Sequence, residues 1–393
     1  MRRIAIAPRP DWRERAEQAG FVFHTIDGAP YWDESAFYAF TLDEIEQGIE
    51  DPTAELHAMA LDLVDEVVGS EQHMERLAIP EPFRDWIAAS WRAREPHLYG
   101  RMDFAWNGIG PAKLLELNYD TPTSLYESAF FQWQWLDDQQ RAGRLPVAAD
   151  QYNSIHESLV EAFGTIAPSL PRPFLLSAVR ESAEDQGTVM YLQECAQQAG
   201  IDCGLIAIED IGVSADGHYT DLSDRTIGTL FKLYPLEDLM REDFARWLPT
   251  SGLRLIEPAW KAVLSNKGIL PLLWEKHRGH PNLLAAEFDD GEGVLAAGWV
   301  RKPLHSREGA NVTIALPDGR RLASEGPYNG PCIRQAFHPL AQFDGRHALL
   351  GSWVVGDRAC GLGIREDASP ITRDGACFVP HVILAEETGV LVA

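Results

Sequence analysis

At residues 99–118 the chain reads YGRMDFAWNGIGPAKLLELN, and this stretch decides the fold. Tyr99 to Trp106 and Ala112 to Asn118 have the composition of strands, and Asn107-Gly108-Ile109-Gly110 between them is a glycine-rich turn. Two strands joined by so short a turn form an antiparallel hairpin.

The register of this hairpin predicts a cluster of oxygen ligands. Side chains alternate across a strand, so a turn centred between Ile109 and Gly110 places Asp103 opposite Glu116 and Arg101 opposite Asn118. Two carboxylates and an amide oxygen suit Mg²⁺, and Arg101 beside them could neutralise a bound phosphate. An exposed polar face, on which Arg101 only pairs with the acids, explains the same spacing equally well.

The segments before the hairpin are predicted to be helical. Thr41 and Glu44 form a capping box, and Asp51-Pro52 predicts the N-cap and first residue of a second helix that ends at Gly69. Its apolar residues recur at three- and four-residue spacing, which indicates core packing. The helical pattern continues to about residue 95.

The segments after the hairpin mix strands and helices. Phe174–Ala178, Gln186–Ala199 and Cys203–Ile208 predict a βαβ unit, and Lys232 lies on a predicted strand at 227–234. After a helix at about 266–277, the last third is mostly strands. They are predicted at 298–304, 310–316, 331–339, 347–355, 358–365 and 377–384.

Two lysines near the end of the chain are candidates for binding phosphate. Lys267 lies at a predicted helix start, where the helix dipole disfavours a cation unless an anion binds there. Lys302 ends a strand and precedes a polar loop that contains Gly309 and could fold over phosphates. Each lysine alone is also explained as a surface residue.

Composition excludes several other classes of protein. The net charge of −25 in 393 residues argues against a nucleic-acid partner. No stretch is long and apolar enough for a membrane span, and five cysteines without a C-x-x-C pair favour a reducing, cytoplasmic location. The chain has no G-x-x-x-x-G-K-[ST], G-x-G-x-x-G, H-E-x-x-H or G-x-S-x-G motif. The twelve tryptophans are interpreted as core residues.

Several segments together resemble the synthetase domain of glutathionylspermidine synthase, an ATP-grasp ligase, in the same order over nearly the whole chain. They are Arg101-Met102-Asp103-Phe104, Glu116-Leu117-Asn118-Tyr119-Asp120-Thr121-Pro122-Thr123, Glu257-Pro258-Ala259-Trp260, Asn266-Lys267-Gly268-Ile269-Leu270-Pro271 and Arg301-Lys302-Pro303. The chain begins directly in this region, without the amidase domain of the bifunctional members, and looks more like their stand-alone bacterial homologues.

The resemblance implies an α+β, ATP-grasp fold with a preceding α/β substrate-binding region. It implies a mainly helical region at 1–99, a substrate and magnesium region with the hairpin and βαβ unit at 100–226, and a nucleotide-binding region at 227–393. It also assigns roles to individual residues. Asp103, Glu116 and Asn118 would hold Mg²⁺, Arg101 would stabilise the transferring phosphoryl group, Lys232, Lys267, Lys302, Gly309, Gln335 and Arg365 would contact ATP, and Thr121 and Thr123 would face the substrate.

The expected activity is an ATP- and Mg²⁺-dependent ligation of a peptide or amino-acid carboxylate to an amine or polyamine, through an acyl phosphate. The absence of a nucleophile motif agrees with this chemistry, which needs positioning and cations. A nucleotide-binding regulatory protein without ligase activity is the alternative. A metal-dependent hydrolase that uses Asp103 and Glu116 is a third hypothesis.

Overall fold

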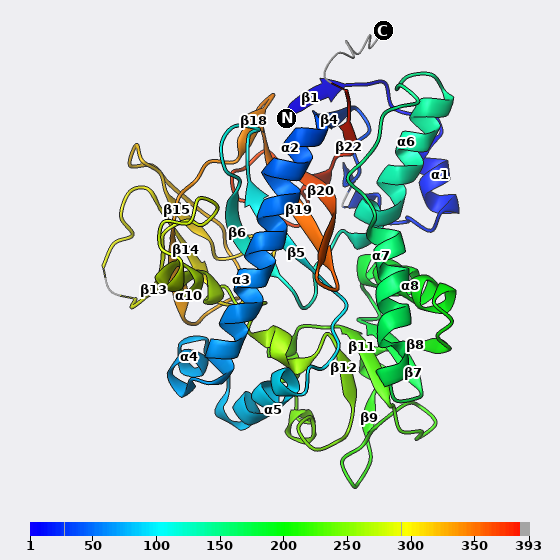
Figure 1. Ribbon diagram of the computed structural model, residues 1–393, viewed down its shortest axis with the longest axis vertical. Coiled ribbons are helices and arrows are strands. Elements are labelled where there is room, and N and C mark those ends of the chain that lie inside the picture. Colours follow the sequence, from blue (N-terminus) through cyan, green and yellow to red (C-terminus); the bar gives the residue numbers. More distant parts are fainter. Residues whose placement is uncertain (27, 292, 386–393) are drawn as a thin grey trace.

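The computed structural model describes residues 1–26, 28–291 and 293–385, and it shows a mixed α and β molecule (Figure 1). Four sheets of three or more strands organise these residues, and they meet around the predicted hairpin. The fold class expected from the sequence is therefore confirmed at the level of its elements.

The largest sheet is antiparallel and contains the hairpin. Its strand order is β21-β20-β19-β5-β6, with β18 pairing at the other end of β19. The strands are β5 (Tyr99–Ala105), β6 (Lys113–Asn118), β18 (Ala341–Phe343), β19 (Arg346–Val355), β20 (Arg358–Asp367) and β21 (Cys377–Phe378). The hairpin thus pairs directly with strands from the C-terminal part of the chain.

A parallel sheet with the order β12-β11-β7-β8 contains the predicted βαβ unit. Its strands are β7 (Phe174–Ala178), β8 (Cys203–Ala207), β11 (Thr229–Leu233) and β12 (Arg254–Ile256). The crossover helix α8 (Ala183–Gln198) begins earlier than predicted because the Ser182 side chain accepts from the Asp185 backbone and caps it. Helix α7 (Ile155–Ile166) packs against α8.

A five-stranded antiparallel sheet, β13-β17-β14-β15-β16, lies beside the hairpin with helix α10 (Ile269–Lys276) (Figure 1). Its strands are β13 (Ala286–Asp289), β14 (Trp299–Pro303), β15 (Thr313–Ala315), β16 (Arg321–Ala323) and β17 (Cys332–Ala336). This sheet carries Lys302 on β14 and Gln335 on β17.

The two ends of the described chain meet in a three-stranded sheet of β1 (Arg2–Ala5), β4 (Ala36–Phe40) and β22 (His381–Ile383). The strand predicted at 377–384 is in fact two strands in different sheets. Pro380 lies between β21 and β22 and cannot donate to a ladder, which explains the break. Two small ribbons complete the strands: β2 (Thr25–Ile26) with β3 (Ala29–Pro30), and β9 (Gly212–Val213) with β10 (Tyr219–Thr220).

The N-terminal helices form one continuous run and not two separate helices. The Thr41 capping box is present, but α2 (Leu42–Ile45) passes through a π-helical turn, Glu46–Glu50, into α3 (Asp51–Val68). Asp51 has helical dihedral angles, so the prediction that it is an N-cap is wrong. The remaining helices of more than five residues are α1 (Trp12–Gln18), α4 (Glu71–Arg76), α5 (Glu81–Arg92) and α6 (Gln132–Arg141), the last preceded by a π-helical turn at Glu127–Phe131.

The buried stripe of α3 packs in one large hydrophobic core with the hairpin, and a second core is rich in aromatic rings. Trp32, Trp135 and Trp353 are fully buried in that second core, whereas Trp133 is 53% exposed and departs from the expected core role. Among the described residues, no helix combines the length and the apolar character needed to cross a bilayer.

The strand pairings do not follow the region boundaries expected from the sequence. Strand β11 pairs with β7 across the expected boundary at 226/227, which joins β12 to the same sheet as β8. The region before residue 100 also contributes β1 and β4 to a sheet with C-terminal β22. Pairing between distant segments is what brings the candidate site together.

Candidate active site

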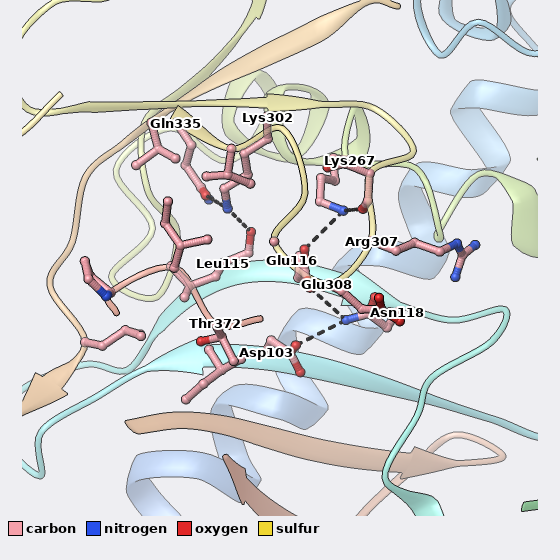
Figure 2. Close-up of a pocket in the computed structure, with 18 of the residues that line it drawn as sticks. Asp103, Leu115, Glu116, Asn118, Lys267, Lys302, Arg307, Glu308, Gln335 and Thr372 are labelled. Atoms are coloured by element: carbon pink, nitrogen blue, oxygen red, sulfur yellow. Dashed lines mark hydrogen bonds and ion pairs between the residues drawn. The ribbon is translucent and has the colours of Figure 1, made fainter. Parts of the chain in front are cut away.

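The hairpin has the register that the sequence predicts. Arg101 lies opposite Asn118 and Asp103 opposite Glu116, and the pairing shifts by one residue immediately after Asp103. Such a bulge is common beside functional sites, where it changes the direction of a side chain. Figure 2 shows Asp103, Glu116 and Asn118 on these two strands, pointing toward one another.

Arg101 and Asp103 form a buried bidentate ion pair. The Arg101 Nε and Nη2 atoms donate to the two Asp103 oxygens at 2.6 and 2.9 Å, and Nη1 donates to the Thr123 carbonyl at 2.6 Å. Burial opposes the charge of Arg101, but Asp103 keeps the pKa of Arg101 above its ordinary value. Arg101 therefore stays charged and links the hairpin to the 120–124 turn.

The two lysines predicted to bind phosphate both contact β6 of the hairpin. Lys267 Nζ lies 3.2 Å from Glu116 Oε2, and Lys302 Nζ donates to the Leu115 carbonyl at 3.0 Å (Figure 2). Burial favours a raised pKa for Glu116, but Lys267 and Lys302 hold the pKa of Glu116 well below its usual range. Burial lowers the pKa of Lys302 to about 8, although Glu116 acts in the opposite direction.

Gln335 and Arg365 complete two sides of the same space. Gln335 accepts from Lys302 Nζ at 2.8 Å and donates to the Leu114 carbonyl at 3.1 Å. Arg365 Nη2 lies 3.3 Å from Asp103 Oδ2. A cavity of about 160 Å³ is lined by eleven of the twelve residues singled out in the sequence. They are Arg101, Asp103, Glu116, Asn118, Thr121, Thr123, Lys267, Lys302, Gly309, Gln335 and Arg365.

The loop after β14 forms one wall of the cavity. Arg307 donates to Thr121 Oγ1 at 2.6 Å and to Glu237 Oε1 at 2.7 Å, which ties the loop to the 120–124 turn. Gly309 has φ +67°, and a Cβ there would lie 2.5 Å from the Thr372 carbonyl oxygen. Glycine is therefore required at 309 for the loop to lie this close to the segment around Thr372.

Lys232 does not reach the cavity. It is fully buried, its Nζ lies 2.5 Å from Asp120 Oδ1, and it donates to the Tyr234 carbonyl at 3.1 Å. The second Asp120 oxygen accepts from the Leu236 backbone at 2.8 Å. The structure thus places Lys232 in an internal ion pair that holds the start of the 120–124 turn, and not in a position to contact a nucleotide.

The helix start at Lys267 also differs from the expectation. The Lys267 backbone N–H donates to the Leu304 carbonyl, and the Gly268 N–H donates to Asn266 Oδ1. These N–H groups are already satisfied within the protein, so they do not point at an anion. The Lys267 side chain reaches the cavity, but the backbone N–H groups of Lys267 and Gly268 do not contribute to it.

The donor set fits a divalent cation of the magnesium type. The Asn118 amide donates to Asp103 Oδ2 at 3.3 Å and to Glu116 Oε1 at 3.2 Å, so one electropositive group already bridges both carboxylates. Rotation of the Asn118 amide by half a turn would bring its oxygen to the position of its nitrogen. Asp103, Glu116 and Asn118 would then each offer a hard oxygen ligand to a cation. No group of three or more His, Cys, Asp or Glu residues suited to a metal occurs among the described residues, so a cation here would rely on two carboxylates and the Asn118 amide.

Two acidic residues near the cavity were missed in the sequence. Glu127 is 1% exposed, and neither of its carboxylate oxygens has a hydrogen-bond partner within the described chain. Burial raises the pKa of Glu127, and burial together with Glu127 raises the pKa of Glu184 to about 8. Glu127 lies nine residues after Asn118, in a helical segment that contains no recognisable motif. Only its burial in the folded protein identifies it.

The hairpin carboxylates, Lys302 on β14 and Lys267 before α10 line one cavity, and this arrangement suits a ligase of the ATP-grasp type. The chain belongs to the glutathionylspermidine synthase preATP-grasp family, which matches residues 3–384. It is accordingly a carbon–nitrogen ligase of that family, and ATP use follows from the family.

Curated relatives and a solved structure agree with this assignment. A Haemophilus influenzae protein named as an acid–amine ligase is 41% identical, over 97% of this chain and 99% of that protein. Crithidia fasciculata trypanothione synthetase is 28% identical over 81% of this chain and 52% of its own length. The Escherichia coli bifunctional glutathionylspermidine synthetase/amidase is 24% identical over 88% of this chain and 60% of its own length. The chain therefore spans between half and two thirds of these two longer enzymes.

The fold is shared with a distant solved structure. A glutathione synthetase-like effector from Globodera pallida has a TM-score of 0.58 at 11% identity and covers 95% of this chain and 96% of its own. The ATP-grasp fold expected from the resemblance is thereby confirmed.

Proposed function

We propose that this protein joins the carboxylate of a small peptide or amino acid to an amine, with ATP and Mg²⁺. The observation that carries the proposal is the charge of the cavity. Five cationic side chains and three carboxylates line the cavity within the described chain, so positive charge is in excess there although the protein has a net charge of −25. Mg-ATP carries a net charge of about −2, which complements this local positive excess.

Asp103, Glu116 and Asn118 are the residues that would hold Mg²⁺, and Lys267, Lys302 and Arg365 would hold the phosphates. When bound, Mg-ATP supplies the phosphoryl group that turns the acid substrate into an acyl phosphate. Arg101, fixed by Asp103 and the Thr123 carbonyl, is placed to stabilise the charge on the transferring group. Gln335, Gly309, Thr121 and Thr123 also line the cavity. The first two would shape the nucleotide side, and the two threonines would face the acid substrate.

The buried acids favour a cationic amine as the second substrate. Neither oxygen of the buried Glu127 carboxyl accepts a hydrogen bond within the described residues, and the pKa of Glu184 is raised to about 8 by burial and by Glu127. Burial disfavours the charged form of both acids, and a bound ammonium group would favour it. This feature supports an amine or polyamine over an alcohol as the acceptor.

ADP release, screened over amines and short peptides with glutathione included, tests the proposal. A ligase releases ADP at a high rate only when acid and amine are both present. Binding of ATP without ADP release for any pair would favour the regulatory alternative. Turnover without ATP would favour a hydrolase.

A further inference from the structure

A second cavity, of about 570 Å³, lies away from the lysines and the hairpin. Its walls come from the end of α1, the turn before α6, α6 itself, α7 and α8, which lie together at the right of Figure 1. This volume is within the range of roughly 300–1,000 Å³ that small-molecule sites occupy. None of the residues assigned above to ATP, Mg²⁺ or the acid substrate lines it.

Aromatic rings form one continuous wall of this cavity. The ring centroids of Trp133 and Phe130 are 6.0 Å apart, those of Phe130 and Tyr126 5.5 Å, and those of Tyr126 and Tyr191 5.6 Å. Trp133 is 53% exposed and Met190, on the α8 wall, is 58% exposed. Large apolar side chains left open at the mouth of a cavity are typical of a binding surface.

Among the described residues, no lysine or arginine lines this cavity. Glu157 and Glu194 lie at exposed positions of its wall and form no salt bridge there, although Glu194 Oε1 accepts from Gln198 Nε2 at 3.2 Å. Asn153 donates through Nδ2 to the Ala129 carbonyl at 3.1 Å, while its Oδ1 is buried and has no hydrogen-bond partner. Such an unpaired buried acceptor is costly unless a ligand donates to it.

The histidine in the cavity cannot supply the missing donor. His156 Nδ1 lies 2.9 Å from the Tyr191 hydroxyl, and Nε2 lies 3.1 Å from Gln198 Oε1. Both ring nitrogens are therefore engaged by neighbouring side chains. Within the described residues, therefore, neither His156 nor a lysine or arginine offers a cation to the two carboxylates or a donor to Asn153 Oδ1.

We propose that this second cavity binds an organic cation with an aromatic or alkyl body. The apolar body lies against the aromatic wall, and the ammonium group faces the ring faces, the two carboxylates and Asn153 Oδ1. Aromatic faces and carboxylates both attract a cation, and together they disfavour an anion. The inference concerns a site separate from the ligase cavity and does not depend on the proposed reaction.

Calorimetric titration of the full chain with three matched probes tests the proposal: phenethylammonium, phenethyl alcohol and 3-phenylpropionate. We expect saturable binding of the ammonium probe, at least tenfold weaker binding of the alcohol and no binding of the carboxylate. Equal affinities for the ammonium probe and the alcohol would overturn the proposal, since the cavity would then be merely apolar. Absence of ammonium binding would overturn it as well.

Three variants place the binding in this cavity. Trp133→Ala should weaken ammonium binding at least fivefold, and the double change Glu157→Gln with Glu194→Gln should bring the ammonium probe within about twofold of the alcohol. Glu161→Gln is the matched control, because Glu161 also lies on α7 but pairs with Arg358 and does not line the cavity. Its affinity should be unchanged. Ammonium binding that survives both test variants would assign the probe to another site and refute the proposal.

Discussion

Replacement of Lys232 by methionine tests whether this lysine stabilises the fold through an internal ion pair or contacts the nucleotide. Lys232 and Asp120 are both fully buried, with 2.5 Å between Nζ and Oδ1. Methionine keeps the length of the side chain but leaves the Asp120 carboxylate with one remaining backbone donor, the Leu236 N–H. Removal of one partner from a buried pair typically costs about 3–5 kcal/mol of unfolding free energy.

That cost translates into a measurable melting shift. Unfolding entropy is about 2.1 cal/mol/K per residue, so a chain of 393 residues loses about 4–6 °C in Tm for about 3–5 kcal/mol. The double change Lys232→Met with Asp120→Asn should recover part of the loss, because no buried charge then lacks a partner. Lys276→Met is the matched control, since Lys276 pairs with Glu66 at the surface and should shift the Tm by no more than about 1 °C.

Nucleotide titration of the same variants decides between the two roles. Because Lys232 does not line the cavity, Lys232→Met should bind ATP with unchanged affinity when assayed well below its lowered Tm. The KM for the acid substrate should rise, because Asp120 begins the turn that carries Thr121 and Thr123. An unchanged Tm with a tenfold loss of ATP affinity would refute the reasoning and restore the nucleotide contact expected from the sequence.

Three further predictions concern the cavity and the acidic residues near it. Asp103→Asn and Glu116→Gln should each lower Mg²⁺-dependent ADP release by at least about 100-fold, and a variant that keeps full activity would exclude its residue from the metal site. Because the pKa of Lys302 is lowered to about 8, its charge is present below that pH and lost above it. ATP affinity should therefore fall as pH rises from 7.5 to 9, and Lys302→Arg should flatten this profile; an equally steep fall in that variant would contradict it. Because the pKa of Glu184 is raised to about 8, its carboxyl is mostly protonated at pH 7, so binding of an amine there should release a proton. Calorimetric heats in buffers of different ionisation enthalpy measure this release, which Glu184→Gln should abolish; equal heats in all buffers would count against the amine site.

The hairpin could be predicted because both of its determinants are local. A period of two sets the faces of the strands, and a short glycine turn sets the register, so the pairing of Asp103 with Glu116 follows from sequence alone. The chain, however, gives no local reason why Lys267 should lie 3.2 Å from Glu116. Lys267 precedes α10, and its backbone N–H donates to the Leu304 carbonyl, just after β14. The contact with Glu116 thus joins segments that are distant in the sequence, and only the family resemblance anticipated it.

Lys232 shows the limit of reasoning from a single strand. Alternation places Phe231 and Leu233 on one face and Lys232 on the other, but it cannot tell whether that other face borders a ligand or another segment. Here both faces of β11 are buried, as is usual for the inner strands of a parallel sheet. The buried partner, Asp120, is more than 100 residues away and carries no pattern that would identify it.

The cations of the cavity are already engaged before any ligand binds, and this shapes how a ligand would be accepted. Lys267 is held by Glu116 and the Ser306 carbonyl, and Arg365 by Asp103. A phosphate group that enters the cavity would take the place of these acceptors. Each cation then exchanges one negatively charged or carbonyl partner for a phosphate oxygen, so no buried charge is left without a partner. The same exchange frees Asp103 and Glu116 oxygens for a divalent cation. Phosphate and metal binding should therefore be mutually favourable, and ATP without Mg²⁺ should bind more weakly than Mg-ATP.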